Sequence, residues 1–217
     1  MSKKKASGPV SSVKLYTTLE REASAEFTER RSVFIGCAAP VKTNDEAVKF
    51  IAKIRSKYDD ATHNVYAYLL GEANVTRYSD DGEPQGTAGI PVLDVIRKGG
   101  ICDAVIVVTR YFGGVLLGAG GLVRAYSAAA SLAVGEAHAV SYESYTEFQV
   151  NCSYSEYQKI EYELPKYGIK CDDTDFGSEI TLKLAVRDVL FDDFSAKLSE
   201  MTAGRVRAAV TGKRFDK

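Results

Sequence analysis

Three carboxylates, Asp80, Asp81 and Glu83, lie within four positions of the stretch YSDDGEPQGTAGIP, residues 78–91. Carboxylates at this density can bind a cation, accept hydrogen bonds from backbone N–H groups, or pair with arginines. The spacing is not that of an EF-hand loop, and Mg²⁺ usually needs a phosphate to complete its shell, so we predict no metal site and no cofactor. This acidic loop is therefore either a solvated turn or a segment held in one shape for chemistry.

A second stretch, VVTRYFGGVLLGAGGLVRAY at residues 107–126, has the composition of a strand, a glycine-rich turn and a helix start. Glycines permit positive φ and close backbone approach, and a helix start exposes N–H groups that bind anions. No GK[ST] follows, as a Walker loop requires, and Val123 stands where a Rossmann fingerprint needs its third glycine. The glycines of this candidate anion site are Gly113, Gly114, Gly120 and Gly121.

Arg124 indicates what the two stretches could share. If the helix begins near Gly120 or Gly121, Arg124 lies in its first turn, where a cation opposes the helix dipole by ~0.3–1 kcal/mol. Arg110, at the end of the preceding strand, adds a second cation. Two sources of negative charge remain open, namely the acidic loop itself and an external phosphate or carboxylate. We predict that one of the loop carboxylates lies within salt-bridging or ligand-bridging distance of Arg110 or Arg124.

Other polar residues are weaker candidates. His63 precedes a strand, and a lone histidine there is expected to be a hydrogen-bonded structural residue rather than a base. Basic residues gather near the end of the chain, where they could contact RNA phosphates, although a solvated terminus is the plainer interpretation. These candidate RNA contacts are Arg205, Arg207, Lys213 and Arg214.

The composition is that of an ordinary globular protein, with 217 residues, 45% apolar residues, 26% charged residues and a net charge of −1. Such a charge gives no long-range attraction to nucleic acid or membrane, so only local patches could provide it. We expect no membrane segment and no secretory signal, because no apolar run approaches ~20 residues and the basic start has no apolar core behind it. The four cysteines are scattered without a CxxC pair, which favours a reduced, cytoplasmic protein.

The second half of the chain has the pattern strand, helix, strand, strand, helix, strand. The predicted strands are 145–152, 169–177, 179–187 and 205–212, and the predicted helices are 155–168 and 188–204. Asp188 is the predicted N-cap of the second helix. This order is that of the ferredoxin-like split motif, so we predict a second domain over residues 141–217.

The first half also mixes helices and strands, and we predict an α+β domain over residues 13–140, preceded by a disordered tail over residues 1–12. Extended segments are expected at 13–19, 25–41, 64–71 and 103–112, and helices at 44–58, 90–100 and 122–140. Asn44 is the predicted cap of the first helix. Small residues along the last helix should let it approach the sheet closely.

The acidic loop stretch and VTRYFGGVLLGAGGLVRAY together resemble the IMPACT/YigZ family, and ATHNVYAY and FIGCAAPV look like further family segments. The resemblance covers nearly the whole chain. It implies a first domain similar to the small ribosomal protein fold, which also occurs in domain IV of elongation factor G. It implies a second domain that resembles the ferredoxin-like domains of that factor.

The resemblance implies a role in translation more than a reaction. Eukaryotic members regulate translation by interfering with activation of a stress kinase, but their binding region includes an additional N-terminal domain, so that partner is not expected here. No activity is settled for the family, and no catalytic residue is inherited. Family members often have a basic residue where this chain has Val33, which weakens a cationic face on that strand, although Arg30 and Arg31 can compensate.

Two functional hypotheses follow. The first is a translation-associated regulatory protein, more a binding protein than an enzyme, that contacts RNA, the ribosome or a translation factor. The second is a small-molecule enzyme or nucleotide binder that uses the acidic loop and the glycine-rich turn. A pure interaction scaffold is the third interpretation.

Overall fold

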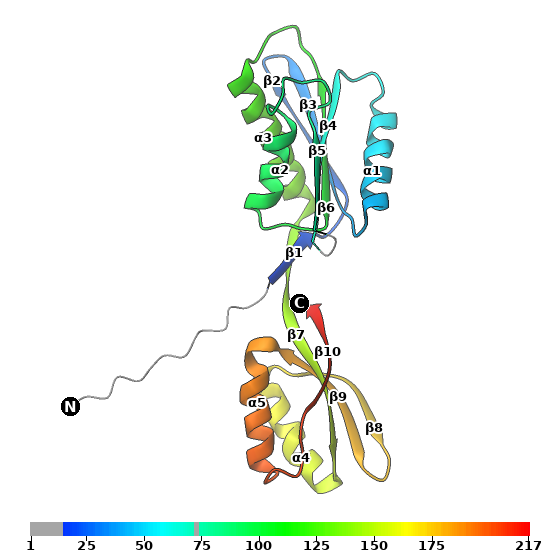
Figure 1. Cartoon of the computed structure of the whole chain (residues 1–217), viewed down its shortest axis with the longest axis vertical. Coiled ribbons are helices and arrows are strands. Elements are labelled where there is room, and N and C mark those ends of the chain that lie inside the picture. Colours follow the sequence, from blue (N-terminus) through cyan, green and yellow to red (C-terminus); the bar gives the residue numbers. More distant parts are fainter. Residues whose placement is uncertain (1–14, 72–73) are drawn as a thin grey trace, which may run out of the picture. The chain divides into compact units, whose positions relative to one another are not determined.

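The computed structural model describes residues 15–71 and 74–217, and the predicted tail at residues 1–12 lies outside this part of the chain. Figure 1 shows the helices and strands of two compact units. One unit is Thr17–Ser141, and the other is Tyr142–Lys217 with the beginning of the first strand, β1 (Leu15–Leu19). Among the described residues, no helix is both long enough and apolar enough to cross a bilayer.

The N-terminal unit is built on a five-stranded sheet whose neighbouring strands are all antiparallel. In spatial order its strands are β2 (Ala23–Glu29), β3 (Ser32–Pro40), β6 (Ala104–Tyr111), β4 (His63–Leu70) and β5 (Val75–Ser79). The central strand β6 is buried along almost its whole length, as its apolar sequence predicts for a strand covered on both faces. Two features differ from the sequence-based expectation. Residues 25–41, expected as one extended segment, form most of a tight hairpin of β2 and β3, and the sequence pattern does not predict β5.

Helices cover both faces of this sheet (Figure 1). Helices α2 (Gly89–Lys98) and α3 (Ala119–Ala137) pack on one face, and α1 (Asn44–Lys57) packs on the other. A Cβ at Gly36 of β3 would overlap the backbone carbonyl of Ala129, so α3 lies directly against the strand. The predicted close approach of the small-residue helix to the sheet is therefore confirmed.

The C-terminal unit has the ferredoxin-like topology that the sequence pattern predicts. Its elements are β7 (Ala139–Cys152), α4 (Tyr154–Glu163), a short 3₁₀ helix η1 (Leu164–Tyr167), β8 (Lys170–Phe176), β9 (Ile180–Arg187), α5 (Asp188–Met201) and β10 (Ala209–Asp216). β7 pairs with both β9 and β10, and β8 pairs with β9, all antiparallel. The resulting order β10-β7-β9-β8 is that of a split β-α-β-β-α-β unit. Aromatic and aliphatic residues such as Phe148, Leu182 and Phe194 form its core.

Two predicted helix caps are wrong by one position. Thr43, rather than Asn44, caps α1, because its hydroxyl accepts the N–H of Glu46. Asp188 is the first residue of α5 rather than its cap, since the residue before it takes the capping position without a side-chain bond. The Asp188 carboxylate instead accepts hydrogen bonds from side chains on β7 and β10, which ties α5 to the sheet.

Candidate functional site

Asp80 of the acidic loop anchors the start of α2. Its carboxylate accepts hydrogen bonds from the N–H groups of Gly86 at 2.9 Å, Ala88 at 3.1 Å and Gly89 at 2.8 Å. The residue in the capping position of α2, Ala88, has no side chain that could accept these N–H groups. Asp80 therefore supplies the cap from outside the helix and compensates for backbone donors that would otherwise be unsatisfied.

Asp81 joins the acidic loop to α1 and β4. One carboxylate oxygen lies 2.7 Å from Arg55 Nη2, and the other accepts the N–H of Asn64 at 2.6 Å. Its carbonyl oxygen lies 2.8 Å from His63 Nδ1, so this nitrogen carries the proton. Asp81 has a positive φ of 46°, and these contacts hold it in that conformation. The expectation that His63 is a hydrogen-bonded structural residue agrees with this arrangement.

Glu83 and Arg110 form a buried ion pair, with 2.6 Å between Oε1 and Nη1. The two side chains are only 4% and 6% exposed. Tyr126 donates its hydroxyl to the same Glu83 oxygen at 2.8 Å, and His63 Nε2 lies 3.8 Å from it. Burial and the negative charge of Glu83 raise the pKa of Tyr126, so its hydroxyl remains a donor. The predicted ion pair between the acidic loop and an arginine is therefore present at Glu83 and Arg110.

Arg124 does not belong to this pair. Helix α3 begins at Ala119, so Arg124 lies in its second turn, where the helix dipole no longer demands a nearby anion. The prediction that placed Arg124 in the first turn was wrong because the helix starts earlier than the glycine pattern indicated. Arg124 is exposed, and it forms no ion pair with any residue in the described part of the chain. Its side chain points back along the helix, since a Cβ at Gly120 would lie 3.8 Å from its Nη1.

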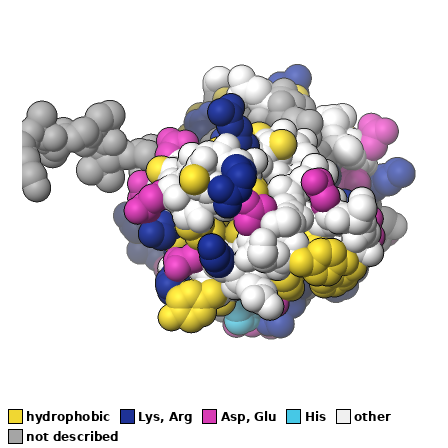
Figure 2. Space-filling view, turned by 90° about the horizontal axis from the view of Figure 1, so that it is seen from below, with side chains coloured by type: hydrophobic (Ala, Val, Ile, Leu, Met, Phe, Trp, Pro, Cys, Tyr) yellow, Lys and Arg dark blue, Asp and Glu magenta, His cyan; other side chains and the backbone are white. Residues whose placement is uncertain are grey.

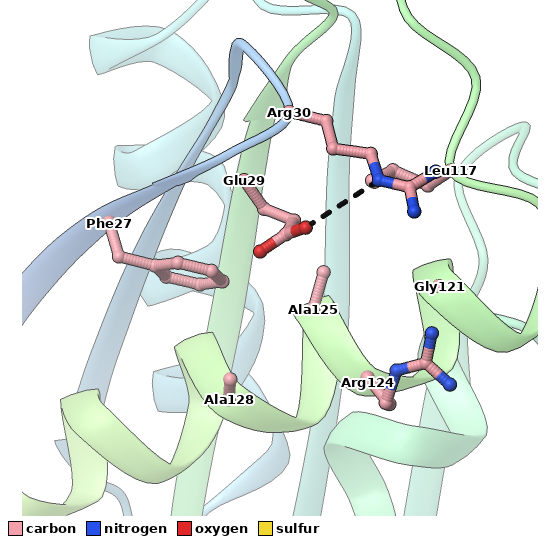
Figure 3. Close-up of a pocket in the computed structure, with 8 residues that line it drawn as sticks. All are labelled: Phe27, Glu29, Arg30, Leu117, Gly121, Arg124, Ala125 and Ala128. Carbon is pink, nitrogen blue, oxygen red and sulfur yellow. Dashed lines mark ion pairs between the residues drawn. The ribbon is translucent and has the colours of Figure 1, made fainter.

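Arg124 lines a pocket of about 220 Å³ between α3 and the β2–β3 hairpin. The residues around the pocket are Phe27, Glu29, Arg30, Leu117, Gly121, Arg124, Ala125 and Ala128. Figure 3 shows the guanidinium groups of Arg30 and Arg124 projecting from the hairpin and the helix toward the side where Leu117 and Gly121 lie. The charge of Arg30 is only weakly offset by Glu29, because their closest atoms are 3.9 Å apart and both side chains are at least half exposed.

The hairpin that carries Arg30 is strained. β2 and β3 pair up to Glu29 and Ser32, so Arg30 and Arg31 form a two-residue turn. Both have positive φ, 45° and 68°, which glycine and asparagine adopt far more readily than arginine. A Cβ at Gly113 would overlap the backbone carbonyl of Arg31, so the glycine-rich turn rests directly on the hairpin. Gly113 is therefore required for close approach, and the two segments fix each other.

The candidate RNA contacts of the C-terminal unit are mostly paired with carboxylates. Arg205 lies 2.9 Å from Glu156, Lys213 lies 2.9 Å from Asp188, and Arg214 makes two hydrogen bonds to Asp172, at 2.6 and 2.9 Å. Arg207 is exposed and has no ion pair within the described ranges. The view from below in Figure 2 shows Lys and Arg side chains interspersed with Asp and Glu side chains.

Several partners in the acidic loop network were not anticipated from the sequence. These partners are Tyr126, Arg55 and Ser32, whose hydroxyl lies 3.4 Å from Arg110 Nη2. They come from different elements, so no sequence spacing relates them. Within the described residues, no group of three or more His, Cys, Asp or Glu side chains is arranged to hold a metal ion.

Comparisons with known proteins cover both units. Residues 30–134 match the Impact N-terminal domain, and residues 150–205 match a domain of unknown function, DUF1949. The chain is 35% identical over 191 residues to the IMPACT family member YvyE of Bacillus subtilis (strain 168), covering 88% of each protein. It is 32% identical over 181 residues to the IMPACT family member YigZ of Escherichia coli (strain K12), covering 82% of this chain and 89% of YigZ.

A crystal structure described as that of a hypothetical protein is similar over 91% of this chain and 98% of its own, with 29% identity and a TM-score of 0.57. The sequence relatives and the structural likeness therefore extend over both units. This chain belongs to the IMPACT family.

Proposed function

We propose that this protein is a translation-associated regulatory protein that binds RNA through phosphate contacts at the pocket between the β2–β3 hairpin and α3. The observation that carries this proposal is the pair of guanidinium groups, Arg30 and Arg124, that line one pocket. The only carboxylate among the lining residues is that of Glu29, which is half exposed and lies 3.9 Å from Arg30, so the two cations outnumber it. Membership in the IMPACT family supports a partner from the translation machinery. No reaction is part of the proposal.

The surroundings of the pocket favour an anion. The first turn of α3 contains no acidic residue, and Gly118 in the capping position offers no side-chain acceptor. Arginine fits phosphate oxygens with two parallel N–H groups, which makes it suited to an RNA backbone. Strain at Arg30 and Arg31 also supports a functional role, because such conformations persist only where the surroundings hold them, often at binding sites.

The second hypothesis, a small-molecule enzyme or nucleotide binder that uses the acidic loop, has less support. Asp80 is committed to the start of α2, Asp81 to Arg55 and the β4 backbone, and Glu83 to Arg110 and Tyr126. These contacts give the loop a structural role and leave its carboxylates occupied. Of the candidate anion site, the part available to an external anion is the pocket beside Gly121 that Arg30 and Arg124 line.

Binding of a fluorescent RNA at several salt concentrations tests the proposal. Affinity should fall as salt rises, because binding releases counterions. Arg30→Ala and Arg124→Ala should each weaken binding for all sequences alike and should reduce the slope of log K against log salt by about 0.7–1. Arg97→Ala is the matched control, since Arg97 is also exposed on a helix of this unit and does not line the pocket.

Salt-independent binding, or no binding at low salt, would contradict the proposal. An equal loss from Arg97→Ala would also contradict it, because the effect would then be that of total charge. A small phosphate compound that raises the melting temperature of the wild type but not of Arg124→Ala, without any RNA binding, would instead support a ligand of the second class.

A further inference from the structure

The loop between β6 and α3 displays apolar side chains, and its backbone is hydrogen-bonded to neighbouring segments at its start. Leu116 is 81% exposed, Phe112 is 46% exposed, and Val115 is also exposed. The loop is held at its start, where the N–H of Phe112 donates to Thr62 Oγ1 at 3.1 Å and that of Gly113 donates to Ser32 Oγ at 3.2 Å. Exposed apolar residues on a held loop indicate a contact surface.

Phe112 has a specific arrangement within this loop. The guanidinium carbon of Arg110 lies 5.4 Å from the centre of the Phe112 ring and 5.5 Å from that of Phe34. Arg110 is itself held by the buried pair with Glu83. The Phe112 ring is thus contacted by a buried cation that an ion pair holds in place, while the residue keeps nearly half of its surface exposed.

We propose that Phe112 is a stacking platform for an unpaired base, so that the RNA bound by this protein is single-stranded at this position. The inference rests on the proposed function and names the class of RNA. Bases that are not paired can stack on aromatic rings, whereas bases inside a duplex cannot. Gly113 touches the backbone of Arg31, so the platform adjoins the arginine hairpin, and cations beside an aromatic platform are the combination that single-strand binding uses.

An RNA partner is favoured over an acidic protein segment by the geometry of Phe112. A protein segment that packs against the loop needs only exposed apolar area. Leu116 and Val115 already provide such area, and this kind of contact does not need a cation against the Phe112 ring. A ring held by hydrogen bonds at its backbone and by a cation beneath it is ordered before binding, which lowers the entropy lost on stacking. The exposed aliphatic neighbours then border the stacked base.

The test uses the whole protein and a single-stranded RNA that carries 2-aminopurine, whose fluorescence is quenched when it stacks. The same sequence annealed into a duplex is the second probe. Wild type should bind the single strand more tightly than the duplex and quench it. Phe112→Ala and Phe112→Leu should both lose the quenching and about 5- to 150-fold in affinity, the range typical for one stacked base, and Phe112→Tyr should keep both. Phe176→Ala, an exposed aromatic of the other unit, is the control and should have no effect.

The variants separate this inference from the proposed function. If Phe112→Leu binds as well as wild type, the contact is apolar rather than stacking, as a protein segment would make, and the platform is refuted. Equal affinity for duplex and single strand also refutes the platform. The phosphate contact would still be supported in that case if Arg30→Ala and Arg124→Ala weaken binding. If wild type binds neither probe at low salt, both proposals fail. Circular dichroism of each variant confirms that the fold is retained.

Discussion

Replacing Arg110 by methionine would remove the cation from the buried pair and leave the Glu83 carboxylate, 4% exposed, without its guanidinium. The remaining partners of that oxygen are the Tyr126 hydroxyl at 2.8 Å and His63 Nε2 at 3.8 Å. Removing one member of a buried ion pair typically destabilises a protein by ~3–5 kcal/mol, because the other charge stays buried. For a domain of roughly this size, the loss corresponds to a melting temperature lower by ~10–20 °C.

The double variant Arg110→Met/Glu83→Gln isolates the charge. Glutamine is uncharged and can still accept the Tyr126 hydroxyl, so the double variant should be at least ~1–2 kcal/mol more stable than Arg110→Met alone. Arg124→Met is the matched control and should stay within ~0.5 kcal/mol of wild type, because Arg124 is exposed and has no ion pair in the described part of the chain. Calorimetry is the appropriate assay, since two units can unfold in separate transitions.

The result that would refute this reasoning is a loss below about 1 kcal/mol for Arg110→Met, the upper end for exposed pairs. A double variant no more stable than the single one would also refute it. Either outcome would mean that the acidic loop opens enough for water to solvate Glu83. The loop would then be a solvated turn.

Substitutions at four further residues test other parts of the structure. Gly113→Ala should lower stability by ~1–3 kcal/mol in urea unfolding, because its Cβ would overlap a backbone carbonyl, whereas Gly135→Ala, with open space around it, should raise stability by ~0.4–1 kcal/mol. Asp80→Ala should cost ~0.5–2 kcal/mol by removing the cap of α2, and Asp80→Asn should cost less. Hydrogen bonds from Ser153 hold the pKa of Glu156 below its ordinary value. The ionised Glu156 carboxylate therefore stabilises the second unit fully above the pKa of an unfolded glutamate, and this stabilisation is lost as pH falls through the lower folded-state pKa. Glu156→Gln should therefore make the second unit's melting temperature less sensitive to acid, measured by calorimetry from about pH 6 to pH 3, and an unchanged profile would contradict this.

The architecture of the second unit could be predicted because its signals are local. Alternation along β9 and the glycine stop at Gly168, which has a φ of 61°, place the elements without knowledge of distant contacts. The hairpin of the first unit could not be predicted in the same way. Its turn consists of Arg30 and Arg31, and neither residue type signals positive φ.

The candidate site could be predicted only in part, because some of its contacts depend on where elements begin and on which distant residues meet. Charge arguments correctly linked the acidic loop to an arginine, but the choice between Arg110 and Arg124 depended on where α3 begins, and helix ends are poorly defined by sequence. The pairing of Arg214 with Asp172 joins residues of different strands, so the sequence alone showed only an excess of cations near the end of the chain. Which charges remain free is a property of the folded structure.

The most direct test of the central claim is an NMR titration of ¹⁵N-labelled protein with a short single-stranded RNA. The proposed phosphate contact predicts that the amide signals of residues 29–31 and 118–124, together with the side-chain Nε signals of Arg30 and Arg124, shift first and saturate together. Shifts confined to residues 205–214 of the C-terminal unit, or to the acidic loop at residues 80–83, would contradict the account.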